Sequence, residues 1–480
     1  MSGDRKRLEA LFNPKGIAII GASEKGMYPS GIISNLQNFG YPYKIFPINP
    51  NRDQVFSLPC YPEIGKAPSK VDLAIIVVNR ERVITALEQC AQAGVPSVLI
   101  ITAHFAEYDQ RGKDLQEQVA KILRQNNLVA LGPNCAGFAN LPAKVIATRL
   151  PCITQTGGLS FISQSGALMM ALYGVFADHQ MGLNKILSVG NQVDINLSEA
   201  LQYLADDPGT THMGAFIEGL QDGKAFVDGL ERALENGKPI VLVKSGRTKI
   251  GSQIAATHTA AIAGSDKVFT AVCRQFGAIL VDDINEMINV LKLQDAYGKS
   301  LSKINNIVIV TQSGGMGSLT ADWFKKEKLN LKPISNQFLQ TLKKDNPNLS
   351  HLNSLNNPVD VRGASLRGDA TAVTLRHFFI DPNIDFLFLL LARTAYQDQD
   401  LETARAIIEI QHETKKPLIV VWMGQRDKEK NAITIDELLK HARIPLYEQT
   451  SDAVRSLAAL QRYWTIRSLY LLHQQNNETT

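Results

Sequence analysis

Short apolar runs that end in Gly, Asn or Ser, each followed by a stretch with helical periodicity, recur along the chain. This alternation is typical of parallel strands that are buried on both faces and joined by crossover helices. It predicts one doubly wound α/β domain, Rossmann-like, over residues 1–140. The five runs that define it are GIAIIG (16–21), KIFPINP (44–50), LAIIVVN (73–79), SVLIITA (97–103) and LVALGPN (128–134).

The remainder of the chain contains an internal repeat, in which strand, turn and following helix recur in the same order. GLSFISQSG (158–166) matches NIVIVTQSGG (306–315), GKPIVLVKSGR (237–247) matches KKPLIVVWMGQR (415–426), and GAILVDDINEMINVLKLQ (277–294) matches RIPLYEQTSDAVRSLAALQ (443–461). The repeat predicts two related flavodoxin-like domains and a tail. Their predicted ranges are 155–296, 304–465 and 466–480, with linkers over 141–158 and 296–306.

The first copy of the repeat carries a segment that the second copy lacks. Gly246 to Gly277 spans 31 positions and Gly424 to Arg443 spans 19, so the first copy is 12 longer. The difference falls at AATHTAAIAG (255–264), which the shared fold does not need. Additional loop residues on a rigid scaffold often carry function.

His258 lies in the middle of this segment, between small residues. No Cys, His or carboxylate stands beside it at metal-ligand spacing, which argues against a metal site. A neutral imidazole nitrogen can instead attack an acyl phosphate. Glu218, at the end of a strand of the same predicted sheet, could fix the imidazole tautomer, because strand carboxyl ends line the ligand crevice. A solvated strand-end Glu remains the alternative.

Three turns combine small residues with a following helix. GASEKG (21–26) resembles a dinucleotide fingerprint with Ser23 in place of the second glycine, and INPN (48–51) lacks the acid that would hold an NAD ribose, so we expect another nucleotide-like ligand. SQSG (163–166) and TQSGGMG (311–317) each combine a Ser or Thr N-cap with Gly. Either alone is compatible with an ordinary helix cap. Together they could hold one phosphate from two sides.

The composition of the chain restricts the classes of partner and the cellular compartment that we expect. Fifty basic and 46 acidic residues leave a net charge of +4, too balanced to indicate a nucleic-acid or membrane partner. Five scattered cysteines without a CxxC pair indicate a reducing compartment. The N-terminus has no secretory h-region and the longest apolar run, 386–392, is too short for a bilayer, so we expect a cytoplasmic protein. GxxxxGK[ST] is absent, which suggests that another polypeptide binds any ADP or ATP.

The ordered set of motifs resembles the NDP-forming acyl-CoA synthetases. It is most similar to the alpha subunits of ADP-forming acetate–CoA ligases, and more distantly to succinyl-CoA synthetase alpha subunits. The resemblance runs from about Leu11 to Tyr463. The motifs are LFNPKGIAIIGAS (11–23), INP (48–50), CYPEI (60–64), VDLAIIVV (71–78), GPNCAGF (132–138), ISQSGAL (162–168), GNQVDIN (190–196), GRT (246–248), THTAAIAG (257–264), TQSGGMG (311–317) and NPVDV (357–361).

The resemblance implies a reversible reaction in which acyl-CoA, ADP and phosphate give a free acid, CoA and ATP. His258 would be the phosphohistidine and Glu218 its orienting group. An ATP-grasp beta subunit, in an alpha–beta hetero-oligomer, would bind ADP or ATP with Mg²⁺. The implied phosphate-binding residues are Ser163, Gln164, Ser165, Gly166, Gln312, Ser313, Gly314 and Gly315. The implied CoA-binding residues are Gly21, Ala22, Ser23, Asn49, Pro50, Val77, Val78 and Thr102.

Two departures keep alternatives open. Ala260 stands where the family loop usually has Gly, and His104 stands where the family often has Gly after the fourth strand. A CoA- or acyl-CoA-binding regulatory protein that kept the fold and lost the relay is therefore a second hypothesis. An NAD-dependent oxidoreductase is the third, against which Asn49 in place of an acid already counts.

Overall fold

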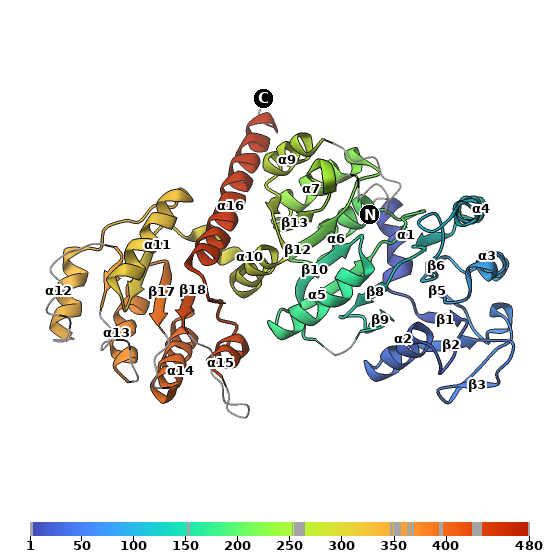
Figure 1. Cartoon of the computed structure of the whole chain (residues 1–480), viewed down its shortest axis with the longest axis horizontal. Coiled ribbons are helices and arrows are strands. Elements are labelled where there is room, and N and C mark those ends of the chain that lie inside the picture. The colour runs from blue at the N-terminus through green and yellow to red at the C-terminus, as the bar shows by residue number, and fades with distance from the viewer. Residues whose placement is uncertain are drawn as a thin grey trace. The chain divides into compact units, whose positions relative to one another are not determined.

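The computed structural model describes three α/β sheets (Figure 1). The described residues are 3–150, 154–251, 253, 265–345, 349, 357–361, 366, 369–392, 397–424 and 434–478. Contacts divide the chain into two compact units, one of Met1–Met287 with Tyr470–Thr480 and one of Ile288–Leu469. The first unit holds two of the sheets and the second unit holds the third. Among the helices that the structure describes, none combines the length and apolar character needed to cross a membrane.

The first sheet contains the five strands that the apolar runs predict, all parallel. A short antiparallel pair, β3 and β4, follows β2. The elements are α1 (Gly3–Phe12), β1 (Gly16–Ile20), α2 (Met27–Asn38), β2 (Lys44–Ile48), β3 (Gln54–Val55), β4 (Leu58–Pro59), β5 (Leu73–Ile76), α3 (Val83–Gln92), β6 (Ser97–Ile100), α4 (Gln110–Asn126) and β7 (Val129–Leu131).

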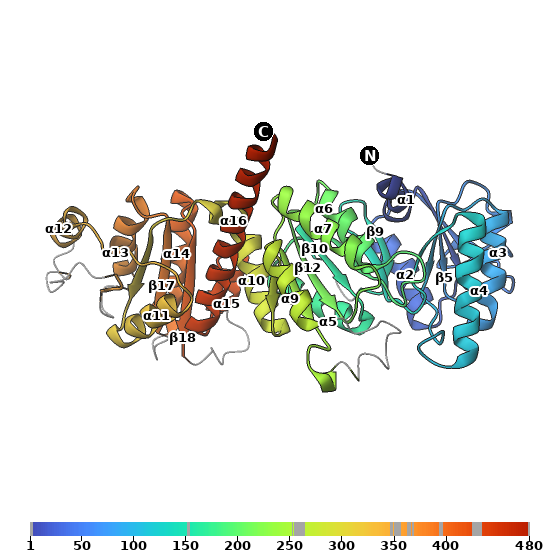
Figure 2. The same ribbon diagram turned by 90° about the horizontal axis from the view of Figure 1, so that it is seen from above.

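The second sheet has seven strands, with helices on both faces. Figure 2 shows β10 and β12 between α6 and α7 on one side and α5 on the other. The elements are β8 (Gly137–Asn140), β9 (Val145–Thr148), β10 (Thr156–Ser163), α5 (Gly166–Asp178), β11 (Leu183–Ser188), α6 (Leu197–Asp206), β12 (His212–Ile217), α7 (Gly223–Glu235), β13 (Ile240–Lys244), α9 (Asp266–Gln275), β14 (Ile279–Val281) and α10 (Ile284–Tyr297).

The third sheet has five parallel strands. The elements are β15 (Ile307–Thr311), α11 (Gly314–Lys326), α12 (Asn336–Asp345), β16 (Val359–Asp360), α13 (Asp369–Ile380), β17 (Phe386–Ala392), α14 (Gln397–Thr414), β18 (Leu418–Met423), α15 (Ile435–His441), β19 (Leu446–Tyr447) and α16 (Thr450–Glu478).

The parallel strands follow one order in all three sheets. Counted along the chain within each sheet, the second strand lies beside the first, and the third, fourth and fifth follow on the other side of the first. This is the flavodoxin-like doubly wound order, which confirms the predicted α/β class. The repeat extends to backbone detail, because Gly277 after α9 and Arg443 after α15 both adopt positive φ, 68° and 56°.

A hairpin departs from the sequence-based expectation. Residues 141–158 were predicted to be a linker, yet they contain β9 and the start of β10. The strand β8 pairs antiparallel with β11, and β9 pairs with β8, so the hairpin extends the second sheet. Asn35 of α2 donates from Nδ2 to the carbonyl of Thr148 at 2.8 Å. The hairpin strands are only four residues long and depend on these tertiary partners, which is why pattern alone missed them.

One hydrophobic cluster joins the first two sheets. Phe12 of α1 stacks on Tyr203 of α6, with ring centroids 4.9 Å apart, and meets Phe138 of β8 edge-on at 5.1 Å. All three rings are buried, together with apolar side chains from both sheets. Because buried aromatic area is a large stabilising term, the first two sheets share their core.

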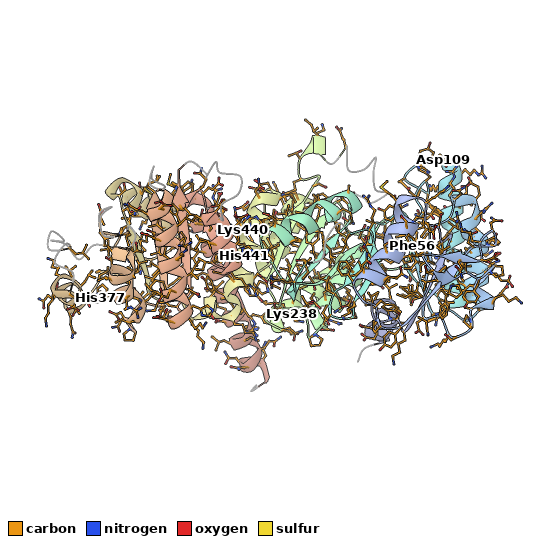
Figure 3. All side chains as sticks on the ribbon, turned by 90° about the horizontal axis from the view of Figure 1, so that it is seen from below. Phe56, Asp109, Lys238, His377, Lys440 and His441 are labelled. Atoms are coloured by element: carbon orange, nitrogen blue, oxygen red, sulfur yellow. The ribbon has the colours of Figure 1, made fainter. Side chains whose placement is uncertain are left out.

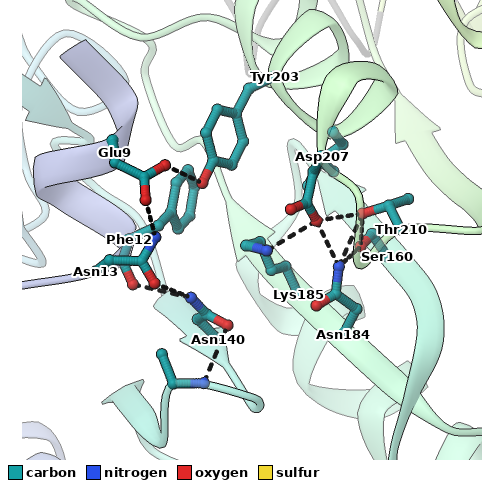
Figure 4. A network of polar contacts seen from close by, with 12 residues as sticks. Glu9, Phe12, Asn13, Asn140, Ser160, Asn184, Lys185, Tyr203, Asp207 and Thr210 are labelled. Carbon is teal, nitrogen blue, oxygen red and sulfur yellow. Dashed lines mark hydrogen bonds and ion pairs between the residues drawn. The ribbon is translucent and has the colours of Figure 1, made fainter. Parts of the chain in front are cut away.

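A buried polar network lies beside this cluster (Figure 4). Asp207, at the end of α6, accepts hydrogen bonds from Lys185 at 2.8 Å, Asn184 at 2.6 Å and Thr210 at 2.7 Å. Ser160 and Thr210 share a further hydrogen bond of 2.8 Å. Asn184 and Lys185 are the second and third residues of β11. The network therefore lies toward the amino end of the second sheet, opposite the edge that this fold favours for ligands.

The predicted tail is a continuation of helix α16. Tyr470 donates from its hydroxyl to Glu231 at 2.8 Å and lies 3.0 Å from the carboxylate of Glu235. Gln474 donates to Glu235 at 2.9 Å. The segment is therefore ordered by contacts with α7. The predicted domain boundaries at 140, 155, 296, 304 and 465 stay predictions.

Candidate functional site

The residues predicted to contact CoA lie at one edge of the first sheet. Gly21, Ala22 and Ser23 follow β1, Asn49 and Pro50 follow β2, Val77 and Val78 follow β5, and Thr102 follows β6. Strand β1 is paired with β2 on one side and β5 on the other, so the strand order reverses there. Ligands of open α/β sheets bind at such a switch point. The structure therefore brings the eight residues to the edge where this fold favours a ligand.

Backbone hydrogen bonds hold the turn after β1 close to its neighbours. The N–H of Gly21 donates to the carbonyl of Ile48 at 3.0 Å, and Asn49 donates from Nδ2 to the carbonyl of Ala22 at 2.9 Å. Gly21 has φ +92°, and a Cβ atom there would lie 2.5 Å from the carbonyl oxygen of Val77. Only glycine fits this approach. Asn49 thus fixes the turn by its amide and supplies no carboxylate for a ribose.

His104 adopts the left-handed conformation, with φ 72°. The carboxylate of Glu107 accepts hydrogen bonds from the N–H of His104 at 2.7 Å and of Phe105 at 3.1 Å. Arg80 donates from Nη1 to the carbonyl of His104 at 2.9 Å. The exposed imidazole lies beside the ring of Tyr108, with centroids 4.5 Å apart. Three groups thus hold a backbone conformation that is costly for any residue except glycine.

The N-terminus of helix α4 holds the loop that contains His104. Asp109, labelled in Figure 3, caps the helix by accepting from the N–H of Gly112 at 2.6 Å and also binds Arg80 at 3.0 Å. These contacts, with the amide of Gly112 first, hold the pKa of Asp109 below its ordinary value. A Cβ atom on Gly112 would clash with the carbonyl oxygen of Phe105. The loop and the helix therefore depend on glycine at this position.

The first phosphate turn joins β10 to α5. Ser163 accepts from the N–H of Ser165 at 3.1 Å, and Ser165 accepts at Oγ from the N–H of Leu168 at 3.3 Å, as an N-cap does. Among the described contacts, none engages the N–H groups of Gly166 and Ala167 in the first turn of α5. These are orphan donors at the positive end of a helix dipole, the arrangement that binds anions.

Gln164, which lies in this turn, hydrogen-bonds to the end of strand β12. Its backbone N–H donates to the carbonyl of Phe216 at 3.2 Å, and its Nε2 donates to the carbonyl of Gly219 at 2.7 Å. Its Oε1 accepts from the N–H groups of Glu218 and Gly219. Its hydrogen-bonding groups are thus engaged within the protein, and its predicted part in phosphate binding stays a prediction.

The second turn joins β15 to α11 in the same way. Thr311 accepts from the N–H of Ser313 at 3.0 Å, and Gln312 donates from Nε2 to the carbonyl of Leu366 at 2.7 Å and accepts from the N–H of Ala392 at 2.9 Å. The side chain of Gln312 is therefore engaged within the protein as that of Gln164 is, and its predicted part in phosphate binding also stays a prediction.

A carboxylate distinguishes the second turn from the first. Asp360 ends β16 in register with Thr311, and its Oδ2 lies 3.1 Å from the position of a Cβ atom on Gly314. Gly314 and Gly315 are the first residues of α11, so an acid lies against that helix N-terminus. This Asp lies within the NPVDV motif and was not among the predicted site residues. The sequence pattern that could have identified Asp360 is an acidic residue at the end of a strand that pairs beside a glycine-rich turn.

Strand β12 ends at Ile217 and presents Glu218 beside the first turn. Ser163 pairs with Phe216 in the ladder, so Glu218 follows the ladder end nearest the N-terminus of α5. The Glu218 side chain is half-buried. His258 lies outside the described residues, as does Ala260. The structure therefore brings Glu218 to the first turn and leaves the position of the histidine as a prediction.

Comparisons with known proteins agree along the whole chain. Residues 15–140 match the CoA binding domain and residues 156–294 match the succinyl-CoA ligase-like flavodoxin domain. The alpha subunits of acetate–CoA ligase [ADP-forming] I and II of Pyrococcus furiosus are 34% and 33% identical to this chain, which covers 97% of each; the matches span 95% and 94% of this chain. The chain belongs to the family of ADP-forming acetate–CoA ligase alpha subunits.

A solved structure of the family has the same fold. The dinucleotide-forming acetyl-coenzyme A synthetase 1 of Ca. Korarchaeum cryptofilum, in complex with phosphate and ADP, superposes with a TM-score of 0.87 at 30% identity. The match covers 96% of this chain and 97% of that one. The alpha-subunit fold thus extends through the third sheet, beyond the two matched domain models.

In the present chain, two cationic side chains of the second sheet were not among the predicted site residues. Lys244 ends β13 in register with Ile217, and burial lowers its pKa against the attraction of Asp266. Arg247 donates from Nε to Asp266 at 3.0 Å and from Nη1 to Asp282 at 2.8 Å. The signal was available in VLVKSGR, where a lysine closes a buried strand.

Within the described ranges of the present chain, no group of three or more His, Cys, Asp or Glu side chains is arranged to hold a metal ion.

Arg247 and Asp266 come from the two sides of the segment that contains His258. The Arg247–Asp266 hydrogen bond therefore joins the stem after β13 to the start of α9.

Proposed function

We propose that the chain is the catalytic alpha subunit of an ADP-forming acyl-CoA ligase, an acid–thiol ligase. It would convert acyl-CoA, ADP and phosphate to a carboxylic acid, CoA and ATP, reversibly. The observation that carries the proposal is the family membership over nearly the full length of both chains. The site residues at the carboxyl edges of the sheets support it, because they supply anion donors and a ligand crevice without an NAD-type acid.

The first step is attack of a phosphate oxygen on the thioester carbonyl. The C–S bond breaks, CoA leaves as a thiolate that takes up a proton, and an acyl phosphate remains. The N–H groups of Gly166 and Ala167, at the N-terminus of α5, would hold the phosphate. Such helix-end donors contribute about 0.3–1 kcal/mol each to a nearby anion, and they carry no full positive charge that would trap the phosphoryl group.

The second step is attack of an imidazole nitrogen of His258 on the phosphorus. The P–O bond to the acyl group breaks and the carboxylate leaves. Glu218 would accept the N–H of the other ring nitrogen, so that the attacking nitrogen keeps its lone pair. We propose that the phosphoryl group then passes to ADP with Mg²⁺ on an ATP-grasp beta subunit of an alpha–beta hetero-oligomer.

CoA would lie along the edge of the first sheet, at the residues that follow β1, β2, β5 and β6. We propose the second turn, at Ser313, Gly314 and Gly315, as a further phosphate contact. We also propose that the protein acts in the cytoplasm and has neither a nucleic-acid nor a membrane partner, since its charge is nearly balanced.

The test is phosphoryl labelling of the chain. The protein, alone and with its beta subunit, is incubated with acetyl-CoA, radiolabelled phosphate and Mg²⁺. We expect acid-labile, base-stable label that disappears in His258→Ala. Label that is absent under both conditions would exclude the relay. Tight CoA binding without label would instead support the regulatory protein of the same fold.

A further inference from the structure

The carboxamide of Gln164 holds the backbone that carries Glu218. Strand β12 ends at Ile217, so the ladder no longer supports the N–H groups of the next two residues. Both donate to Oε1 of Gln164 instead, and Nε2 of Gln164 returns a bond to the carbonyl of Gly219 at 2.7 Å. Gln164 is 8% exposed, so these bonds lie in a low-dielectric environment that strengthens them.

In the second copy of the repeat, a glutamine also holds a strand end, but the residue at the position of Glu218 is not an acid. The backbone N–H of Gln164 donates to the carbonyl of Phe216, and its carboxamide accepts from the N–H of Glu218, two residues later. The backbone N–H of Gln312 donates to the carbonyl of Leu390, and its carboxamide accepts from the N–H of Ala392, again two residues later. Ala392 therefore occupies in the third sheet the position that Glu218 occupies in the second. The second copy shows what the carboxamide does where no carboxylate needs to be placed: it holds a strand end.

We propose that Gln164 is a positioning residue for the phosphoryl relay, which acts by fixing the Cα position and direction of Glu218. The inference rests on the proposed function, because it takes Glu218 to be the group that orients His258. This role requires no contact between the side chain of Gln164 and phosphate. It sets where the Glu218 carboxylate can accept the imidazole N–H.

The proposal predicts that loss of Gln164 and loss of the Glu218 carboxylate act through one step. Loss of a group that orients a metal-bound histidine costs about 10- to 100-fold, and we expect a loss on this scale for Glu218. If the carboxamide works through Glu218, its removal slows the reaction no further once the carboxylate has been replaced. If it supports only the fold, the two losses multiply.

The experiment is a double-mutant cycle on the alpha–beta complex, read as the initial rate of labelling from acetyl-CoA and radiolabelled phosphate across a pH series. The variants are Gln164→Leu, Glu218→Gln and the pair. We expect each single variant to be about 10- to 100-fold slower and the pair to be no slower than the worse single. Gln164→Leu is also expected to alter the pH profile as Glu218→Gln does.

The repeat supplies the matched control. Gln312→Leu removes the bond from the N–H of Ala392 and the bond to the carbonyl of Leu366. Its effect, whatever its size, is expected to multiply with that of Glu218→Gln. Gln164→Glu keeps the acceptor oxygen and loses the donor, and we expect a rate between those of Gln164→Leu and the wild type. This second variant keeps the test valid if Gln164→Leu fails to fold, which circular dichroism would reveal.

Three failures can be told apart. Effects of Gln164→Leu and Glu218→Gln that multiply, or an unchanged pH profile in Gln164→Leu, overturn the positioning role while the relay stands. A wild-type complex that takes up no label overturns the proposed function and this inference with it. A Glu218→Gln complex that labels at the wild-type rate overturns the orienting role of Glu218 and this inference, while the relay stands.

Discussion

The carboxylate of Asp207 lies 2.8 Å from the ammonium of Lys185, and both side chains are almost fully buried, at 11% and 6% exposure. Asn184 and Thr210 donate to the same oxygen. Burial alone would raise the pKa of Asp207, but hydrogen bonds from Lys185, Thr210 and Asn184 outweigh it and bring the pKa below its ordinary value of 3.8. The pair therefore stabilises the folded unit only while Asp207 is ionised.

Replacement of Asp207 by Asn should lower the free energy of unfolding at neutral pH by about 3 kcal/mol, because it leaves the buried Lys185 charge without its partner. The wild type should lose its advantage as the pH falls below 3.8 and through the lowered pKa in the folded state. Urea unfolding of both proteins over a pH series measures the difference. A difference that stays constant with pH would show that ionisation of Asp207 is not its source.

Gly112→Ala should destabilise the first sheet by about 1–3 kcal/mol, since the added methyl group is forced against the Phe105 carbonyl. The matched control is Gly174→Ala in α5, where no atom lies within 4 Å of the new Cβ. There we expect a gain of roughly 0.5–1 kcal/mol from the reduced entropy of the unfolded chain. Thermal unfolding separates the two. Equal effects at both positions would contradict the close approach at Gly112.

His104→Gly should stabilise the protein. Relief of the left-handed conformation of a residue with a Cβ atom gains about 1–2 kcal/mol, more than the roughly 0.5–1 kcal/mol that glycine loses to unfolded-chain entropy. His104→Ala keeps the strain and serves as the control for loss of the ring. If the two variants unfold at the same temperature, the conformation at this position carries no cost.

Asp360→Asn tests the second turn. If phosphate contacts the N-terminus of α11, removal of the carboxylate beside Gly314 should lower the apparent KM for phosphate about two- to fivefold, the equivalent of roughly 0.3–1 kcal/mol. Steady-state kinetics of the alpha–beta complex with acetyl-CoA and ADP measures it. An unchanged KM would place the phosphate at the first turn alone.

The sequence predicted what depends on periodic burial and missed what depends on tertiary partners. The five strands of the first sheet and the repeat were readable because each strand is an apolar run buried on both faces. The roles of Gln164 and Gln312 were not readable, because a carboxamide after a strand is equally compatible with a bound anion and with a neighbouring strand end. Asp360 reaches Gly314 only through the pairing of β15 and β16, which no local pattern encodes.

The site divides in the same way. Small residues and strand ends pointed to the carboxyl edge of the first sheet and to Glu218, since carboxyl ends of parallel strands converge. The CoA contacts at that edge stay a prediction. Glycine at 112 and the strained His104 could not be foreseen, because their conformations follow from packing of α4 on a loop. The role of His258 still rests on the repeat and on the family resemblance.

The β8–β9 hairpin makes the succinyl-CoA ligase-like module incomplete on its own. Expressed without residues 1–154, this module would leave β11 with an open row of amide and carbonyl groups, a template for pairing with another copy. We therefore expect residues 155–296 to self-associate on a sizing column and residues 1–296 to remain monomeric. The residues that precede the second module thus complete the edge of its sheet, so the two modules are expected to need each other for a soluble fold.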